Sequence, residues 1–269
     1  MRVFYDGFLG SPRLDHPEGV AVHPDGSVWC GGEAGQLYRI APDASAAEVV
    51  ACTDGFLLGV AVAPDGEAVY ACDIAHRAVF RYDVAAGALE RFVTGADGVG
   101  FRNPNSIAIS ADGSAIYVSD SYPAHVPGPS VFRFTPSGDG AVWFGESSAF
   151  ANGIALAPDG SALYVAESFL PGVRRIAIDA ATGAAGVREL VVELPGTVPD
   201  GLAFGPDGLL YVACYEPSQI LRVLPDGQVQ VVAHDPTAHE LCHPTNIAFR
   251  GSAIIAANLG RWHLTEVSI

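Results

Sequence analysis

Residues 152–160, Asn-Gly-Ile-Ala-Leu-Ala-Pro-Asp-Gly, are one copy of a segment that organises the whole chain. The segment is a short apolar run that ends in a Pro-Asp-Gly or Ala-Asp-Gly turn, and a second apolar run follows the turn. Six copies, the last without the Asp-Gly turn, begin at Gly19, Gly59, Ser106, Gly153, Gly201 and Asn246. The start-to-start spacings are 40, 47, 47, 48 and 45 residues, so the copies fill the chain.

Each copy predicts a β-hairpin, because two short apolar runs are joined by a glycine-containing turn. A third run follows in most copies and a fourth in several. Four antiparallel strands repeating every ~40–50 residues are typical of a propeller blade, so the sequence predicts an all-β, six-bladed β-propeller. After Asn246 only three strands fit, and we expect residues 2–5, Arg-Val-Phe-Tyr, to supply the outer strand of the sixth blade. One domain over residues 1–269 follows.

The charge composition excludes several function classes. The 14 basic residues are all arginines, and against 30 acidic residues they give a net charge of −16. The absence of lysine excludes Schiff-base chemistry and the phosphate-loop lysine. A surface this acidic repels nucleic acid and anionic lipid, so we expect no nucleic-acid or membrane partner. A small-molecule substrate and a monomer or weak oligomer are expected instead.

The five cysteines are never spaced C-x-x-C, which indicates neither a disulfide framework nor a four-thiolate zinc site. The N-terminal residues reach Asp6 before any apolar segment develops. A cytoplasmic location is therefore expected.

A polar column precedes the repeats. The residue just before each copy is Glu18, Leu58, Asn105, Asn152, Asp200 or Thr245. In a propeller these six positions surround one end of the central channel, here called the mouth. Two carboxylates and two amide carbonyls form an all-oxygen set that suits a hard divalent cation such as Ca²⁺. The alternative is that Asn and Asp serve as turn residues after proline, as at Pro104 and Pro199.

A second column stands at the end of each second strand. Because the second strand runs antiparallel to the first, this column is expected at the same mouth. Its members are Gly32, Asp73, Asp120, Glu167, Cys214 and Asn258.

Four segments resemble the gluconolactonase, regucalcin and senescence-marker-protein family of six-bladed propellers. They are Pro17-Glu18-Gly19, residues 103–108 around Asn105, residues 151–168 around Asn152, and residues 194–203 around Asp200. The resemblance implies one divalent cation, usually Ca²⁺, held by Glu18, Asn152 and Asp200, with Asn105 contacting substrate or a metal-bound water. Mg²⁺, Mn²⁺ and Zn²⁺ are alternatives. It also implies hydrolysis of sugar lactones or related cyclic esters.

The chain departs from the family pattern at two places. Val20 stands where family members often carry proline after the first ligand, and Ser106 stands where many carry aspartate. Arg102 matches a sugar-contacting arginine of the regucalcin branch. Other parts resemble the strictosidine-synthase-like propellers, which implies condensation, cyclisation or epimerisation as the alternative chemistry. A non-catalytic interaction propeller is the third possibility.

The expected mechanism is metal-assisted hydrolysis. The cation would polarise the carbonyl oxygen and acidify a water, and Asp200 would take or relay the proton. Asn105 and Arg102 would orient substrate oxygens, and Asp120 stands beside them.

Two histidines complete the candidate substrate-binding set. His125 lies in the proline-rich insert 122–129, which is expected to overhang the mouth. His243 directly precedes the sixth copy. Residues 239–243, His-Glu-Leu-Cys-His, match the zinc-protease pattern formally, but Pro244 disfavours the helix that this chemistry requires, which favours a surface loop.

Overall fold

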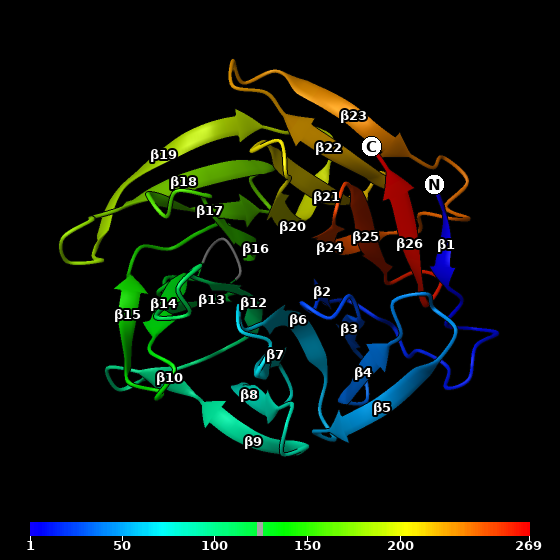
Figure 1. The fold of residues 1–269 in the computed structure, drawn as a ribbon. Coiled ribbons are helices and arrows are strands. Elements are labelled where there is room, and N and C mark those ends of the chain that lie inside the picture. The colour runs from blue at the N-terminus through cyan, green and yellow to red at the C-terminus, as the bar shows by residue number, and fades with distance from the viewer. Residues whose placement is uncertain (123–125) are drawn as a thin grey trace.

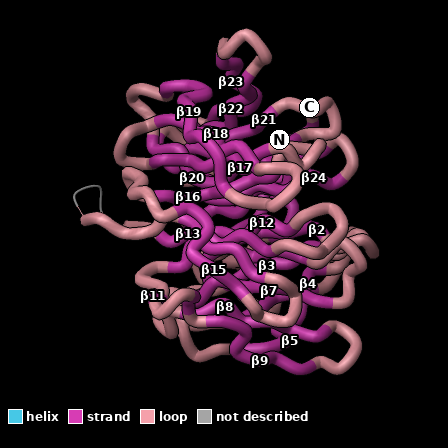
Figure 2. The backbone as a smooth tube through the Cα atoms, turned by 90° about the vertical axis from the view of Figure 1, so that its left-hand side faces the viewer, coloured by secondary structure: helices cyan, strands magenta, loops and turns pink. Residues whose placement is uncertain are grey.

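The computed structural model describes residues 1–122 and 126–269, and six four-stranded antiparallel sheets surround a central axis in it (Figure 1). The predicted all-β, six-bladed propeller is confirmed. A view at right angles contains strands and loops only (Figure 2). In the described ranges, no helix is long and apolar enough to cross a membrane.

The first three blades run through the N-terminal half of the chain, each with its innermost strand first. Blade 1 consists of β2 (Val20–Val22), β3 (Val28–Gly31), β4 (Gln36–Ile40) and β5 (Ala47–Cys52). Blade 2 consists of β6 (Leu57–Val62), β7 (Ala68–Asp73), β8 (Ala78–Asp83) and β9 (Ala88–Val93). Blade 3 consists of β12 (Pro104–Ile109), β13 (Ile116–Asp120), β14 (Val131–Phe134) and β15 (Gly140–Phe144).

The remaining blades follow the same order. Blade 4 consists of β16 (Ala151–Leu156), β17 (Ala162–Glu167), β18 (Gly172–Ile178) and β19 (Ala185–Glu193). Blade 5 consists of β20 (Val198–Phe204), β21 (Leu210–Glu216), β22 (Gln219–Val223) and β23 (Val229–His234). Blade 6 consists of β24 (Pro244–Arg250), β25 (Ala253–Asn258), β26 (His263–Ser268) and β1 (Arg2–Tyr5).

The ring closes as the sequence predicts, because β1 pairs antiparallel with β26 and forms the outer strand of blade 6. Arg2 lies opposite Glu266, and their side chains form an ion pair at 3.1 Å. Phe4 and Tyr5 enter the core shared with blade 1. The two chain ends therefore lie in the same blade (Figure 1).

One small hairpin between blades 2 and 3 has no counterpart in the repeat. It joins β10 (Gly95–Ala96) to β11 (Val99–Gly100). Asp97 in its turn accepts a hydrogen bond from the Val142 amide at 2.8 Å, which fixes the hairpin to β15.

The Asp-Gly turns set the hairpin geometry. In blade 4, the Gly160 amide donates to the Ala157 carbonyl at 2.8 Å, and Asp159 accepts from the Ser161 amide at 3.0 Å. Gly160 has a φ of +70°, a conformation that glycine adopts without a steric penalty. The same turn is repeated in the first five blades and explains the recurrence of Asp-Gly in the sequence.

The hydrophobic core is divided into six clusters, one at each interface between neighbouring blades. Between blades 1 and 2, for example, Trp29 packs against Tyr82 with ring centroids 5.8 Å apart. Each blade buries both faces in this way, which explains why the inner strands are continuous apolar runs instead of alternating ones.

At the mouth the innermost strands pack backbone against backbone. A Cβ atom at Gly19, Gly59, Gly153 or Gly201 would collide with the first residues of the next blade's innermost strand. The two copies without glycine form hydrogen bonds there instead. Ser106 Oγ accepts from the Ile154 amide at 3.3 Å, and Asn246 Nδ2 donates to the Glu18 carbonyl at 3.1 Å.

This packing predicts that Gly153→Ala is destabilising. The added methyl group meets the Asp200 carbonyl oxygen and the Gly201 Cα atom, neither of which can move without shifting β20. We expect a loss of about 1–3 kcal/mol in the free energy of unfolding, measured by urea denaturation. Gly145→Ala is the control, because Gly145 is exposed and its nearest neighbour lies 4.0 Å away. Equal stability of the two variants would contradict the prediction.

Candidate metal centre at the mouth

Four oxygen-bearing side chains begin the innermost strands of four blades. Glu18 stands two residues before β2, Asn105 lies in β12, Asn152 in β16 and Asp200 in β20. All four are buried, with 4–6% of their surface exposed. Because these strands surround the axis (Figure 1), the four side chains lie at one end of the channel, and together they are called the oxygen cluster.

Each member of the oxygen cluster has an oxygen with no hydrogen-bond partner. These atoms are Glu18 Oε2, Asn105 Oδ1, Asn152 Oδ1 and Asp200 Oδ1. Among the described residues they are the only buried side-chain oxygens in this condition. A buried, unpartnered oxygen costs about 1–3 kcal/mol, so four of them in one place need a compensating ligand. Carboxylate and amide oxygens are the donors of a hard divalent cation, and the cluster fits one.

The electrostatics of the two carboxyl groups agree with this fit. Burial raises the pKa of Asp200 to about 7. Burial, followed by the charge of Asp200, raises the pKa of Glu18 well above its usual range. The two carboxyl groups are thus desolvated and repel each other, and a nearby positive charge would relieve both effects.

Hydrogen bonds from neighbouring blades hold the oxygen cluster in place. The Glu18 carbonyl accepts from Thr245 Oγ1 at 2.7 Å and from Asn246 Nδ2, which ties the first blade to the last. Asn152 Nδ2 donates to Ser168 Oγ at 3.2 Å, and Ser168 donates to the Pro199 carbonyl at 2.7 Å. Because the Asn152 amide nitrogen donates to Ser168, only Asn152 Oδ1 remains without a hydrogen-bond partner.

The second polar column has a structural role. Its carboxylate and amide side chains accept hydrogen bonds from the loops that lead into the innermost strands of their own blades. The donors are the amides of Phe56 for Asp73, Arg102 and Asn103 for Asp120, Ala149 for Glu167, and Cys242 for Asn258. These side chains hold the loops that lead to the oxygen cluster, and none of their oxygens is a buried oxygen without a hydrogen-bond partner.

Asp120 and Arg102 occupy the predicted side of the mouth. Asp120 is fully buried, and burial raises its pKa to about 6 although two backbone amides donate to it. Arg102 is exposed, and its guanidinium carbon lies 4.6 Å from the centre of the Tyr122 ring. Asp120 thus positions the loop that carries Arg102. Contact of Asp120 and Arg102 with substrate stays a prediction.

Of the two predicted histidines, only His243 lies in the part of the chain that the structure describes. His243 is half-buried at the mouth, where its ring stacks on Tyr215 with centroids 4.5 Å apart. His125 lies outside the described residues. Residues 239–243 form bends, so the helix required for a zinc-protease site is absent there.

A second group of potential metal ligands lies beside the mouth. His16 Nδ1 lies 2.5 Å from Glu33 Oε2 and 3.5 Å from Asp15 Oδ1. These side chains are 31–49% exposed and pair with one another. Unlike the oxygen cluster, this group contributes no oxygen to the buried unpartnered atoms, although His16 Nδ1 is a buried nitrogen without a hydrogen bond.

The sequence does not reveal several side chains at the mouth. One is Tyr215, whose pKa is raised by burial, by the Glu216 charge and, to a smaller extent, by the charge of the nearby Asp200. Three further side chains are Phe150, which packs on Phe169, Trp262, which packs on His16, and Ser168, which donates to the Pro199 carbonyl. The sequence position of Phe150 could have indicated its place at the mouth, because Phe150 stands two residues before Asn152. His16 and His243 stand at the same distance before Glu18 and Thr245.

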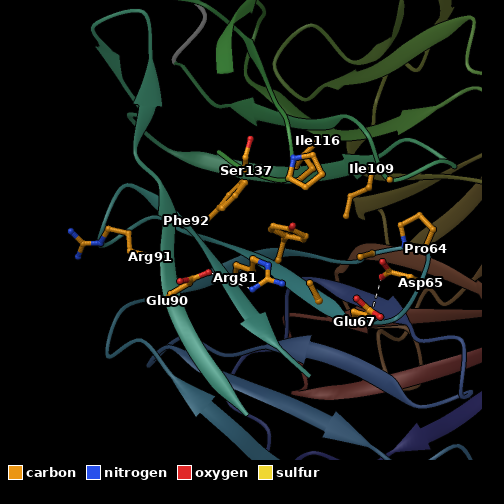
Figure 3. Close-up of a pocket in the computed structure, with 15 residues that line it drawn as sticks. Pro64, Asp65, Glu67, Arg81, Glu90, Arg91, Phe92, Ile109, Ile116 and Ser137 are labelled. Atoms are coloured by element: carbon orange, nitrogen blue, oxygen red, sulfur yellow. Dashed lines mark hydrogen bonds and ion pairs between the residues drawn. The ribbon is translucent and has the colours of Figure 1, made fainter. Parts of the chain in front are cut away.

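A hollow of about 550 Å³ between blades 2 and 3 is a different feature (Figure 3). Pro64 and Asp65, which line it, belong to a turn at the end of the channel opposite the mouth. Its wall contains the Arg81–Glu90 ion pair at 3.4 Å. No member of the oxygen cluster lines this hollow.

The fold and the oxygen cluster define a six-bladed propeller with a polar centre at one end of its channel. The family model described as SMP-30/Gluconolactonase/LRE-like region matches residues 123–255, and the model described as strictosidine synthase-like, N-terminal, matches residues 8–40. The resemblance to the gluconolactonase and regucalcin family is thereby confirmed. Comparison with curated protein sequences gives no match.

Solved structures share the fold at low sequence identity. A gluconolactonase from Xanthomonas campestris is 21% identical, with 98% of this chain and 88% of that chain covered and a TM-score of 0.76. The calcium-binding protein regucalcin from Agrobacterium tumefaciens is 18% identical, with 95% and 90% covered and a TM-score of 0.75. Virginiamycin B lyase from Staphylococcus aureus is 17% identical, with 94% and 80% covered and a TM-score of 0.68.

The raised Asp200 pKa predicts a pH dependence of stability in the metal-free protein. A carboxyl group whose pKa is higher in the folded than in the unfolded state stabilises the fold at low pH. That contribution is lost as the pH rises from about 4 to about 7. In EDTA, we therefore expect the unfolding free energy of the wild type to fall relative to that of Asp200→Asn across this window. Parallel curves from urea denaturation would contradict the prediction.

Proposed function

We propose that the protein is a divalent-cation-dependent hydrolase that acts on a lactone or related cyclic ester. The observation that carries the proposal is the set of four buried, unpartnered oxygens at the mouth. The gluconolactonase-like family match supports the reaction class. A purely structural propeller would gain nothing from two carboxyl groups buried together without partners.

In this proposal Glu18, Asn152 and Asp200 hold the cation, and Asn105 contributes the fourth oxygen or contacts the substrate. An all-oxygen set favours Ca²⁺, with Mg²⁺, Mn²⁺ and Zn²⁺ as alternatives, because zinc sites in proteins usually include histidine or cysteine. When bound, such a cation polarises a carbonyl oxygen and makes water more acidic.

The chain's own residues perform the remaining steps. A water molecule adds to the lactone carbonyl carbon, the ring C–O bond breaks, and a hydroxy acid forms. The Asp200 carboxylate accepts the proton that the water loses and returns it to the departing ring oxygen. The Asn105 amide orients the substrate, and so does the exposed guanidinium of Arg102. His243, which is half-buried and stacks on Tyr215, is a further substrate contact in this proposal.

The same centre also supports a second candidate function. The strictosidine synthase-like match over residues 8–40 favours a propeller enzyme that condenses, cyclises or epimerises its substrate. Mass analysis of the product distinguishes the two, because hydrolysis adds one water to the substrate. A non-catalytic interaction propeller would show neither product.

We propose further that residues 1–269 act as one domain, as a monomer or weak oligomer in the cytoplasm, on a small-molecule substrate. The acidic composition without lysine supports the absence of a nucleic-acid or membrane partner.

The proposal predicts that hydrolysis of lactones requires both the cation and Asp200. We expect EDTA to abolish turnover and added Ca²⁺ to restore it. Asp200→Asn should lower kcat/KM about 100-fold or more, because it removes both a ligand charge and the proton acceptor. Asp226→Asn is the matched control, since Asp226 is an exposed turn residue of the same blade. Full activity of Asp200→Asn, or of the EDTA-treated enzyme, would rule out this mechanism.

A further inference from the structure

Ring-bearing side chains with left-handed backbone occupy an equivalent position in three blades, and a fourth ring, that of Phe56, stands at this position in blade 2 without left-handed backbone. His16, Phe150 and His243 each stand two residues before the mouth residue of their blade. All three have left-handed backbone, with φ of +44°, +67° and +51°. Bulky residues rarely adopt this conformation, whereas glycine does so freely. The fold alone would therefore favour glycine at these positions, which indicates that the rings serve another purpose.

Each of these rings packs on a second ring at the mouth end of a second strand. The second ring lies either in the strand itself, as Tyr215 does in β21, or in the loop that follows it. His16 contacts Trp262 with centroids 4.3 Å apart, Phe150 contacts Phe169 at 4.8 Å, and His243 stacks on Tyr215 at 4.5 Å. Trp262 also has a left-handed backbone, with φ of +57°. These six side chains are here called the ring collar.

The ring collar belongs to the mouth and not to the propeller core. Five of its members are partly exposed, and Phe169 is 58% exposed. Phe169 and Phe8 are the only exposed phenylalanines among the described residues, and both lie in loops at the mouth end. Leu9 and Leu170 beside them are 82% and 59% exposed. Exposed aliphatic side chains also lie on outer strands, such as Val187 on β19, whereas the exposed phenylalanines lie only in these loops among the described residues.

The collar offers few groups that could bind a polyhydroxylated ring. It contains no carboxylate or amide side chain, and the neighbouring carboxylates of Asp15 and Glu33 already pair with His16. The Arg102 guanidinium lies over the Tyr122 ring. His243 Nδ1 is already within 3.0 Å of the Tyr215 carbonyl. A sugar needs several directed hydrogen bonds, whereas aromatic and alkyl groups bind by packing on exposed rings.

We infer that the ring collar selects lactones or cyclic esters that carry an aromatic or alkyl group, in preference to sugar lactones. This inference rests on the proposed hydrolase function and specifies its substrate class. The ester would meet the oxygen cluster while its apolar part packs against Tyr215, Phe150 and Phe169.

The first experiment compares two six-membered lactones, dihydrocoumarin and glucono-δ-lactone, with the Ca²⁺-loaded full chain. We expect kcat/KM for dihydrocoumarin to be at least about tenfold higher, the equivalent of one buried ring contact. Preference for glucono-δ-lactone would overturn the inference and leave the proposed hydrolase intact. Turnover of neither would count against the proposed function.

Binding tests the collar independently of hydrolysis. The lactam analogue of dihydrocoumarin cannot be hydrolysed as an ester, and calorimetry should detect it binding at least about tenfold more tightly than gluconolactam. Equal binding, or tighter binding of gluconolactam, would overturn the inference.

Two variants locate the effect at the collar. Tyr215→Ala should raise KM for dihydrocoumarin about tenfold with little change for glucono-δ-lactone, and Tyr215→Phe should restore it. Phe150→Gly should have the same selective effect without loss of thermal stability, because glycine accepts a φ of +67°. Val187→Ala, which removes an apolar side chain 71% exposed on β19, is the control. Equal changes for both lactones would contradict a specificity role.

Discussion

The close packing of neighbouring innermost strands at the mouth is the contact on which the rest of the structure depends. Gly19, Gly59, Gly153 and Gly201 leave no space for a side chain against the next blade. This packing draws the preceding residues, including Glu18, Asn152 and Asp200, toward the axis. The contact that closes the ring therefore also brings polar side chains together at one end of the channel. The outer strands of the blades do not take part in this contact.

Concentrating these groups is unfavourable for the protein alone. Burial raises the pKa values of both Glu18 and Asp200, and their free oxygens have no protein donors. By contrast, Asp120 and Glu167 lie farther out and accept hydrogen bonds from backbone amides. The outer column of the mouth thus has its hydrogen bonds made, whereas the oxygens of the inner cluster lack partners. The divalent cation that we propose there would account for this difference.

The sequence predicts the repeated parts of this arrangement well. Six blades, closure by residues 2–5 and the column of Glu18, Asn105, Asn152 and Asp200 all follow from aligning copies of one segment. The hairpin at 95–100 and the members of the ring collar other than His243 were missed, because most of them lie in loops that differ between blades. Phenylalanine and tryptophan are not residue types that predict a positive φ, so the backbone conformation of Phe150 and Trp262 could not be predicted. The hydrogen bonds from backbone amides to Asp120 depend on tertiary contacts.

Calorimetric titration of Ca²⁺ into EDTA-treated, dialysed protein measures most directly whether the oxygen cluster holds a divalent cation. We expect one ion bound per chain. Binding by Glu18→Gln should be weakened roughly 100-fold because a ligand charge is lost, and binding by Asp65→Asn, at the opposite end of the channel, should be unchanged. Absence of binding in the wild type, or the same affinity in Glu18→Gln, would contradict a cation site in the oxygen cluster.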